Sequence, residues 1–359
     1  MSDEIYHRLA KVLDTLPNGF PSTESGVEIK LLKKVFTPDE ADLFCDLRLT
    51  METADQVADR TGRPKEGLEG MLTSMWERGE VFGVDLGGVK LFKMIPWVLG
   101  VYEFQLNRMD REFAQMCEEY APYFAKGFFE NKPQFMKVVP IEEDVPAGSE
   151  TLVYDQVSAI IEAGQSFAVA DCICKKEKAL LDLRCDKPME VCMAVAPVPG
   201  VMDKSPWGRP ITKEEAYGVL KMAEKAGLVH MTHNVQSGHY FICNCCGCCC
   251  GILRGINEYG YTDAVNSKYY ARIDAESCIA CGICADERCQ VNAISEVDDY
   301  YAVDKNRCIG CGLCVSTCPE EAISLLEKPE AEIAVPPVDE NDWYKVRGEG
   351  RGVDFSKFM

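Results

Sequence analysis

The sequence predicts an α+β protein, and three observations lead to this fold class. Capped helical segments precede a hairpin pattern near the N-terminus, 18 of the 20 cysteines lie after residue 171, and one cysteine spacing occurs twice, 30 residues apart. These observations divide the 359 residues into expected parts. They are an N-terminal domain over 1–95, a helical and cysteine-rich domain over 96–267, a domain of repeated cysteines over 268–327, and an extended C-terminal arm over 328–359.

The N-terminal part is expected to consist of helices followed by a hairpin. Thr37 with Glu40 forms a capping box, in which each residue satisfies a free amide of the first helical turn, and the pattern recurs at Thr53. Apolar runs at 81–84 and 89–92 flank a glycine-rich turn, which is typical of a β-hairpin. Three helices followed by a hairpin resemble a winged helix-turn-helix domain, and this resemblance implies DNA readout.

The charge of the third expected helix argues against DNA readout. Acidic side chains outnumber basic ones along it, with Glu66, Glu69, Glu77 and Glu80 against Lys65 and Arg78. A helix that enters a groove of DNA is expected to be basic. We therefore expect this winged-helix-like domain to dock onto a protein or to serve a structural role, and we expect no nucleic-acid partner.

The composition of the whole chain limits its compartment and partners. A formal net charge of −20 argues against binding to a phosphate backbone or an anionic membrane surface. No run approaches the roughly 18 apolar residues of a membrane-spanning helix, and the N-terminus lacks a secretory apolar region. We expect a cytoplasmic protein, in which clustered cysteines bind metal, while the isolated Cys45 and Cys117 are buried as small apolar residues.

The residues before the first cysteine group are expected to be helical with one extended segment. Aromatic residues recur at helical spacing over 101–130 and are expected to face a core, an extended stretch follows over 136–141, and another helix lies near 154–163. Further along, Thr212 predicts a capped helix that ends at Gly227.

The strongest pattern is a repeated cysteine motif. Each half has three cysteines spaced C-x2-C-x2-C and a fourth further on, namely Cys278, Cys281, Cys284 and Cys289 in the first half and Cys308, Cys311, Cys314 and Cys318 in the second. Three thiolates from one tight loop can bind three irons of a cubane, and a thiolate from the other half can bind the fourth. Tetrahedral zinc does not suit two linked triplets of this kind.

This segment resembles the bacterial-type ferredoxin family, which carries two [4Fe-4S] clusters. The resemblance implies the ligands Cys278, Cys281, Cys284 and Cys318 for one cluster and Cys308, Cys311, Cys314 and Cys289 for the other. The second half matches the family's C-x2-C-x2-C-x3-C-P. The first half departs from it, because four residues separate Cys284 from Cys289 and Gln290 stands where proline is usual.

Ten further cysteines lie in the middle domain in two groups, Cys172, Cys174, Cys185 and Cys192 in one and Cys243, Cys245, Cys246, Cys248, Cys249 and Cys250 in the other. The first group could hold a cluster whose negative charge neighbouring lysines offset. Adjacent cysteines in the second group cannot all serve one cubane without strain, so we expect some to bind iron and others to pack. One or two further iron–sulfur clusters are expected here. The histidines nearby, at 230, 233 and 239, are expected to form hydrogen bonds instead of binding metal.

The arrangement of the middle and C-terminal cysteines resembles a group of ferredoxin-domain proteins from anaerobes, and the resemblance implies electron transfer. We expect a polyferredoxin-type oxidoreductase subunit of anaerobic metabolism that relays low-potential electrons. Its redox partner would be a flavin- or metal-containing oxidoreductase subunit in an oligomeric complex. The chain has no GxGxxG motif after a strand and no P-loop, so a nucleotide cofactor would have to bind to that partner.

Two alternative functions remain open from the sequence. One is a reductase whose catalytic iron–sulfur centre lies at Cys243–Cys250 and acts on a thiol, disulfide or thioester. The other is a redox-sensing regulator in which the N-terminal domain reads DNA. No carboxylate or serine constellation presents itself as a catalytic site, so no catalytic residue is assigned.

Overall fold

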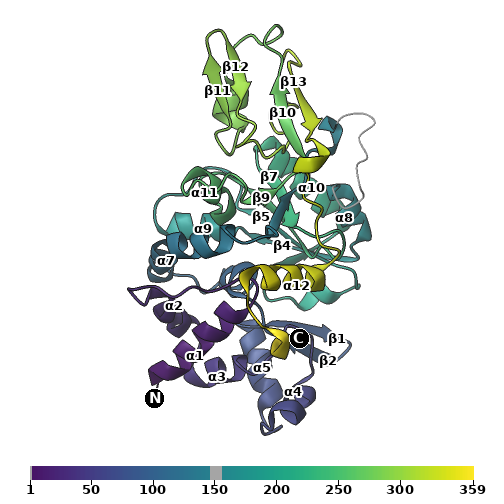
Figure 1. Ribbon diagram of the computed structural model, residues 1–359. Helices are drawn as coiled ribbons and strands as arrows, with labels where there is room; N and C mark the ends of the chain where they lie inside the picture. The colour runs from purple at the N-terminus through teal and green to yellow at the C-terminus, as the bar shows by residue number, and fades with distance from the viewer. Residues whose placement is uncertain (1, 146–155) are drawn as a thin grey trace.

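The computed structural model describes residues 2–145 and 156–359 and has three levels (Figure 1). Helices and a small hairpin form one end, a large sheet with helices on both faces forms the centre, and four short strands form the other end. The combination of helices and mostly antiparallel strands confirms the predicted α+β class.

Five helices and a hairpin form the N-terminal level. They are α1 (Ser2–Thr15), α2 (Val27–Val35), α3 (Pro38–Phe44), α4 (Ala54–Thr61), α5 (Leu68–Glu77), β1 (Phe82–Leu86) and β2 (Val89–Lys93). Both predicted capping boxes are present, since the hydroxyl of Thr37 accepts from the amide of Glu40 and that of Thr53 accepts from the amide of Gln56. The hairpin is also confirmed, with Phe82 opposite Lys93.

The central level contains a seven-stranded sheet in the order β6-β4-β5-β8-β7-β3-β9. Its strands are β3 (Met136–Val138), β4 (Ser166–Asp171), β5 (Glu190–Ala196), β6 (Arg209–Ile211), β7 (Val229–His233), β8 (Phe241–Cys245) and β9 (Val265–Asn266). Neighbouring strands are antiparallel except β3 and β9, which are parallel. Two cysteine-bearing segments therefore meet, because β5 carries Cys192 and its neighbour β8 carries Cys243 and Cys245.

Helices cover both faces of this sheet (Figure 1). They are α6 (Tyr102–Phe104), α7 (Arg111–Phe129), α8 (Val157–Ala163), α9 (Ile173–Leu180), α10 (Lys213–Lys225) and α11 (Gly251–Asn257). Along β4, Phe167 and Val169 pack with α8 and α10, whereas Ala170 joins the core on the side of α7, α9 and α11. This alternation is what a strand buried on both faces requires.

The helical predictions for this level hold with one break. Residues 105–110 interrupt the span expected over 101–130, and Asp110 caps α7 by accepting from the amide of Phe113. The helix after Thr212 is present with its capping box. Part of the helix expected near 154–163 lies outside the described residues, and α8 covers the rest.

Two antiparallel strand pairs form the third level. They join β10 (Tyr269–Ile273) to β13 (Ile323–Glu327) and β11 (Ile294–Val297) to β12 (Tyr300–Val303). The first pair connects the two halves of the cysteine repeat, since β10 precedes the first triplet and β13 follows the second. The repeat seen in the sequence is thus also a repeat in the fold.

The prediction of an extended C-terminal arm is wrong for its second half. Residues 340–351 form the helix α12 (Glu340–Arg351), which crosses the molecule between its lower and central levels (Figure 1). Asp339 caps the helix by accepting from the amide of Asp342, and Trp343 and Arg347 are fully buried. Burial of this face stabilises the helix despite the glycines in its last turns.

One continuous core joins the lower and central levels. Its buried side chains come from the N-terminal helices, from α7 and α11 and from α12, so no break in the core falls at the expected boundary between residues 95 and 96. Cys45 and Cys117 are buried in it, as predicted. None of the described helices has both the length and the apolarity that crossing a membrane requires.

Arg347 is expected to contribute strongly to stability. Its guanidinium donates to the carbonyl oxygens of Pro17, Phe128, Asn131 and Pro133, and it has no exposed surface. The substitution Arg347→Met leaves these buried carbonyls without a donor, so it should lower the free energy of unfolding by about 3 kcal/mol. Urea denaturation under anaerobic conditions measures the change. Lys345→Met, on the exposed side of the same helix, serves as the control and should shift stability by less than about 0.5 kcal/mol; equal effects would contradict the role of Arg347.

Candidate metal centres

The structure places the eight repeated cysteines around two cavities of about 20 Å³ each. One cavity is lined by Cys278, Cys281, Cys284 and Cys318, and the other by Cys289, Cys308, Cys311 and Cys314. Each cavity thus receives three thiols from one triplet and a fourth from the other half of the repeat. These are the same two sets of four that the ferredoxin resemblance implies.

Backbone amides approach the sulfur atoms of this region. The amide of Ala293 donates to Sγ of Cys289 at 3.1 Å, and that of Ala322 donates to Sγ of Cys318 at 3.3 Å. These two bonds occupy equivalent positions in the repeat, and each amide follows a residue with positive φ, Asn292 or Glu321. Amide donors of this kind stabilise negative charge on sulfur, so the loops are preformed for thiolate ligands.

Burial makes several of these thiols harder to deprotonate, although Cys281 is exposed. Burial raises the pKa of Cys284 to about 11 and that of Cys311 to about 12. A buried thiolate needs a compensating cation, and a bound metal supplies one while displacing the proton. Four-cysteine cavities with amide donors to sulfur therefore fit iron–sulfur clusters.

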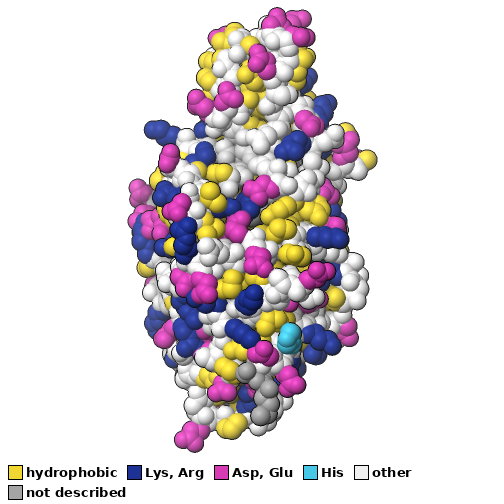
Figure 2. All heavy atoms as spheres, turned by 90° about the vertical axis from the view of Figure 1, so that its left-hand side faces the viewer, with side chains coloured by type: hydrophobic (Ala, Val, Ile, Leu, Met, Phe, Trp, Pro, Cys, Tyr) yellow, Lys and Arg dark blue, Asp and Glu magenta, His cyan; other side chains and the backbone are white. Residues whose placement is uncertain are grey.

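The exposed surface of this level is acidic. Figure 2 shows acidic side chains gathered at the tip of the molecule, the end that β11 and β12 form. The exposed acidic residues of the level include Asp274, Glu276, Asp286, Glu287, Asp298, Asp299, Glu320 and Glu321. Negative charge near a cluster disfavours added electrons and attracts basic protein surfaces.

The departures from the ferredoxin pattern lie where this level contacts the central one. The extra residue precedes Arg288, which is buried and donates to the carbonyls of Glu224 and Lys225 at the end of α10 and to that of Leu313. In the place of the usual proline, Gln290 accepts from the amide of Gly247 at 3.0 Å.

Gly247 lies too close to the repeat for any larger residue. A Cβ atom at this position would lie 1.9 Å from the carbonyl oxygen of Gln290. Asn257 closes the contact by donating to the carbonyls of both Gly247 and Gln290. The loop with six cysteines is thereby joined to the residue that follows Cys289.

Six of the ten middle cysteines form a ring. Each of these thiols influences the pKa of two others, which gives a closed series in the order Cys172, Cys174, Cys250, Cys245, Cys243 and Cys192. They come from the start of α9, the strands β5 and β8, and the start of α11. All six line one cavity of about 150 Å³. We refer to these six residues as the six-thiol ring.

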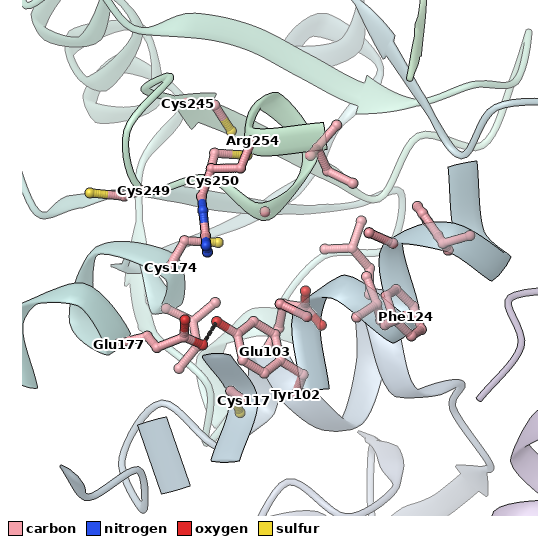
Figure 3. Close-up of a pocket in the computed structure, with 18 of the residues that line it drawn as sticks. Tyr102, Glu103, Cys117, Phe124, Cys174, Glu177, Cys245, Cys249, Cys250 and Arg254 are labelled. Carbon is pink, nitrogen blue, oxygen red and sulfur yellow. Dashed lines mark hydrogen bonds between the residues drawn. The ribbon is translucent and has the colours of Figure 1, made fainter. Parts of the chain in front are cut away.

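The other four middle cysteines form a compact group beside the ring. The sulfur atoms of Cys185, Cys246, Cys248 and Cys249 all lie within 4.8 Å of one another. Figure 3 shows Cys249 pointing away from Cys174, Cys245 and Cys250 of the ring. The sequence groups Cys185 with Cys172, Cys174 and Cys192, whereas the structure places it with the later cysteines. We refer to these four residues as the compact group.

A buried lysine lies near both cysteine groups. Lys175 has no exposed surface, and its ammonium donates to the carbonyl of Pro188 at 2.7 Å. Although burial opposes its charge, nearby thiolates of Cys172 and Cys246 raise its pKa. Lys175 thus supplies the positive charge expected near thiolates, whereas Lys178 pairs with Glu118 and Lys187 donates to the carbonyl of Ala226.

Two of the three histidines of this region lie within hydrogen-bond distance of a side chain, as the sequence leads us to expect. Nδ1 of His230 lies 2.5 Å from the amide oxygen of Asn244, and Nδ1 of His239 lies 3.4 Å from the hydroxyl of Thr232. His233 differs, because it packs among aromatic rings, including Phe135 and Trp343, and its nitrogens have no hydrogen-bond partner.

The cavity beside the ring contains acidic side chains that no sequence motif marks. Tyr102 donates to Glu177 at 2.6 Å, and Arg254 lines the same cavity (Figure 3). Burial, together with the neighbouring Glu118, raises the pKa of Glu177 to about 8. Burial likewise raises the pKa of Glu103 to about 8. These carboxyl groups are protonated at neutral pH.

A second and larger cavity adjoins the first. It has a volume of about 380 Å³ and shares Glu103, Cys192 and Cys243 with the cavity of the six-thiol ring. Its walls are mostly aromatic and aliphatic, and one ion pair, Lys93 with Glu340 at 3.3 Å, lies on it.

Glu177 should make the stability of the protein depend on pH. Its carboxyl holds a proton up to about pH 8 in the folded state but releases it near pH 4.3 when unfolded, so stability should fall as pH rises between these values. The loss between these two pH values is at most about 5 kcal/mol, and Glu177→Gln should abolish it. Urea unfolding from pH 5 to pH 8.5 measures both curves. The control is Glu24→Gln at an exposed position, and a wild-type curve parallel to that of Glu177→Gln would contradict the prediction.

Comparison with known proteins supports the interpretation of the third level as a segment similar to ferredoxins. Residues 271–325 match the family described as the 4Fe-4S dicluster domain. Among curated proteins no match to the chain is found. The matched span contains both four-cysteine cavities, so the ferredoxin-type resemblance of this segment is confirmed, and the C-terminal part of the chain is similar to a 4Fe-4S dicluster domain.

Proposed function

We propose that this protein is an iron–sulfur subunit that relays single electrons between its dicluster segment and a third centre held by the six-thiol ring. The contact between Gln290 and Gly247 carries the proposal, because it joins a dicluster cysteine, Cys289, to the loop that supplies Cys245 and Cys250. Iron–sulfur clusters exchange electrons one at a time when bound. The fold thus brings two groups of ligands together through one hydrogen-bonded contact.

The six-thiol ring has more ligands than one cubane needs. A [4Fe-4S] cluster binds four thiolates, one for each iron. Six thiolates around one cavity either hold a larger centre or leave two thiols beside a cubane. Lys175 offsets part of the resulting negative charge from a position with no exposed surface.

The acidic tip indicates that the redox partner has a basic surface. Its exposed carboxylates would be attracted to a basic surface, as is common where soluble redox proteins meet. A flavin- or metal-containing oxidoreductase subunit with such a surface is the proposed partner, in a cytoplasmic complex of anaerobic metabolism. The electrons are expected to be of low potential.

The N-terminal domain is proposed to have a winged-helix-like fold that docks onto a protein. Arg78 directly follows α5, which corresponds to the third helix expected from the sequence, and it pairs internally with Glu40 and Glu80. Its charge is therefore neutralised within the protein. This arrangement disfavours the alternative of a DNA-reading redox sensor.

A cluster-based reductase is the second candidate function, and the adjoining cavities favour it. The cavity of about 380 Å³ lies against Cys192 and Cys243 of the six-thiol ring, and Glu103 lies on both cavities. An apolar cavity beside a redox centre and a protonated carboxyl could admit a small disulfide or thioester and provide a proton.

The number of irons tests the third centre. Anaerobically purified protein should contain more than about eight irons, with about twelve indicating one additional cubane and about sixteen an eight-iron centre. Cys245→Ser should remove only the iron above eight, because Cys245 lines the ring cavity and neither dicluster cavity. Cys45→Ser, outside every cysteine group, is the control. Stepwise reduction monitored by electron paramagnetic resonance should show that the wild type takes up more electrons than its two dicluster centres accept. Cys245→Ser should take up no more than those two centres accept. A wild type with only eight irons would refute the relay.

Substrate addition separates the relay from the reductase. If the ring centre is catalytic, small disulfides or thioesters should change the paramagnetic resonance spectrum of the reduced protein and be consumed by the isolated chain. We expect the spectrum to remain unchanged for a relay. A change that disappears in Val201→Trp, at a half-buried position on the wall of the larger cavity away from the cysteines, would establish the reductase instead.

A further inference from the structure

The compact group differs in geometry from every other cysteine set of the protein. Sulfur atoms of Cys185 and Cys246 lie 3.7 Å apart, those of Cys185 and Cys249 3.8 Å, and those of Cys248 and Cys249 3.7 Å. In the part of the chain that the structure describes, it is the one group of three or more Cys, His, Asp or Glu ligands that all lie within 4.8 Å of one another.

These separations match the coordination sphere of a single ion. Zinc binds thiolates at about 2.3 Å, and the edge of a tetrahedron is about 1.6 times the distance from its centre to a corner, so four such sulfur atoms lie about 3.8 Å apart. In a cubane each thiolate binds a different iron, and the sulfur atoms occupy the corners of a larger tetrahedron. The eight dicluster cysteines are more widely spaced, since no three of them meet the 4.8 Å limit.

We propose that Cys185, Cys246, Cys248 and Cys249 bind one tetrahedral metal ion, zinc or a single iron, in a site that adjoins the ring cavity, which Cys249 also lines. Both ions accept four thiolates at this geometry. Binding releases the protons of the four thiols to solvent. The proposal does not depend on the electron relay, because it concerns four cysteines that the relay does not use.

The position of the site indicates what the ion does. Cys246, Cys248 and Cys249 lie in the turn between β8 and α11, and Cys185 lies in the segment between α9 and β5. An ion bound by all four residues joins two segments more than 60 residues apart in the chain. Since Cys245 and Cys250 flank this turn and belong to the six-thiol ring, the ion fixes the loop that presents them to the cavity.

The surroundings of the site place the ion at the edge of the core, next to solvent. Cys248 is exposed, whereas Cys246 and Cys249 are buried, so the site is accessible from one side. Lys175 near Cys246 offsets part of the double negative charge that four thiolates retain around a divalent ion. Gly247, within the same turn, accepts the close approach of Gln290.

Metal analysis and X-ray absorption of the wild-type holoprotein test the proposal directly. Anaerobically purified protein should contain about one zinc per chain, or one iron above the amount matched by acid-labile sulfide. For zinc, the zinc absorption edge should show four sulfur neighbours at about 2.3 Å and no iron neighbour. For a single iron, which the iron edge does not separate from the clusters, the Mössbauer spectrum should show one tetrathiolate iron distinct from the cluster irons. The zinc result and the iron result distinguish the two ions, and both support the site. Nitrogen or oxygen ligands, or a neighbouring iron, would overturn it.

A cysteine variant links the ion to these residues. Cys248→Ser removes an exposed ligand of the compact group, so after a chelator challenge it should retain at least tenfold less of the single ion while its cluster iron and sulfide stay unchanged. Cys45→Ser is the matched control and should retain the ion. Loss of iron and sulfide in equal amounts would show that the group binds a cluster. If the variant does not fold, the wild type with cobalt incorporated provides the test. Cobalt in the compact group should show the intense ligand-field absorption of a tetrahedral tetrathiolate, and the absence of this absorption would overturn the proposal.

Discussion

Burying thiolates close together is the constraint on which the rest of the structure depends. Each thiolate taken out of water costs free energy unless a metal, a cation or an amide donor compensates its charge. The protein meets this cost in three ways: amides of Ala293 and Ala322 donate to sulfur, Lys175 is buried among the middle cysteines, and the cavities leave room for metal. Among the middle cysteines, strands β5 and β8 of the seven-stranded sheet hold Cys192, Cys243 and Cys245 on neighbouring strands.

The sheet also explains why so many cysteines can be accommodated in one place. Adjacent strands such as β5 and β8 bring residues far apart in the chain side by side, and side chains alternate between the faces. The turn after β8 then divides its cysteines, with Cys245 and Cys250 in the ring and Cys246, Cys248 and Cys249 in the compact group. Two different groups of thiols thus arise from eight consecutive positions, because the chain turns between β8 and α11 within them.

Local signals in the sequence predicted local structure, but contacts between distant segments could not be predicted from the sequence. The capping boxes at Thr37 and Thr212 and the repeated triplets were readable because their partners lie a few residues away. The partners of Cys185 come from more than 60 residues further on, which spacing alone cannot reveal. In the sequence, Arg288 and Gln290 stand out only as departures from the ferredoxin pattern. Their roles become clear only from the central level of the fold, against which they pack. The helix α12 was missed because its glycines disfavour it and the burial of Trp343 stabilises it.

The guanidinium of Arg347 has a consequence for biogenesis. It donates to Pro17, a residue synthesised 330 positions earlier, and to three carbonyls around the end of α7. The N-terminal helices therefore cannot reach their final packing until α12 has been translated and has folded against them. Without this helix the four carbonyls would have no guanidinium donor, and the part of the core that Trp343 fills would be open to solvent.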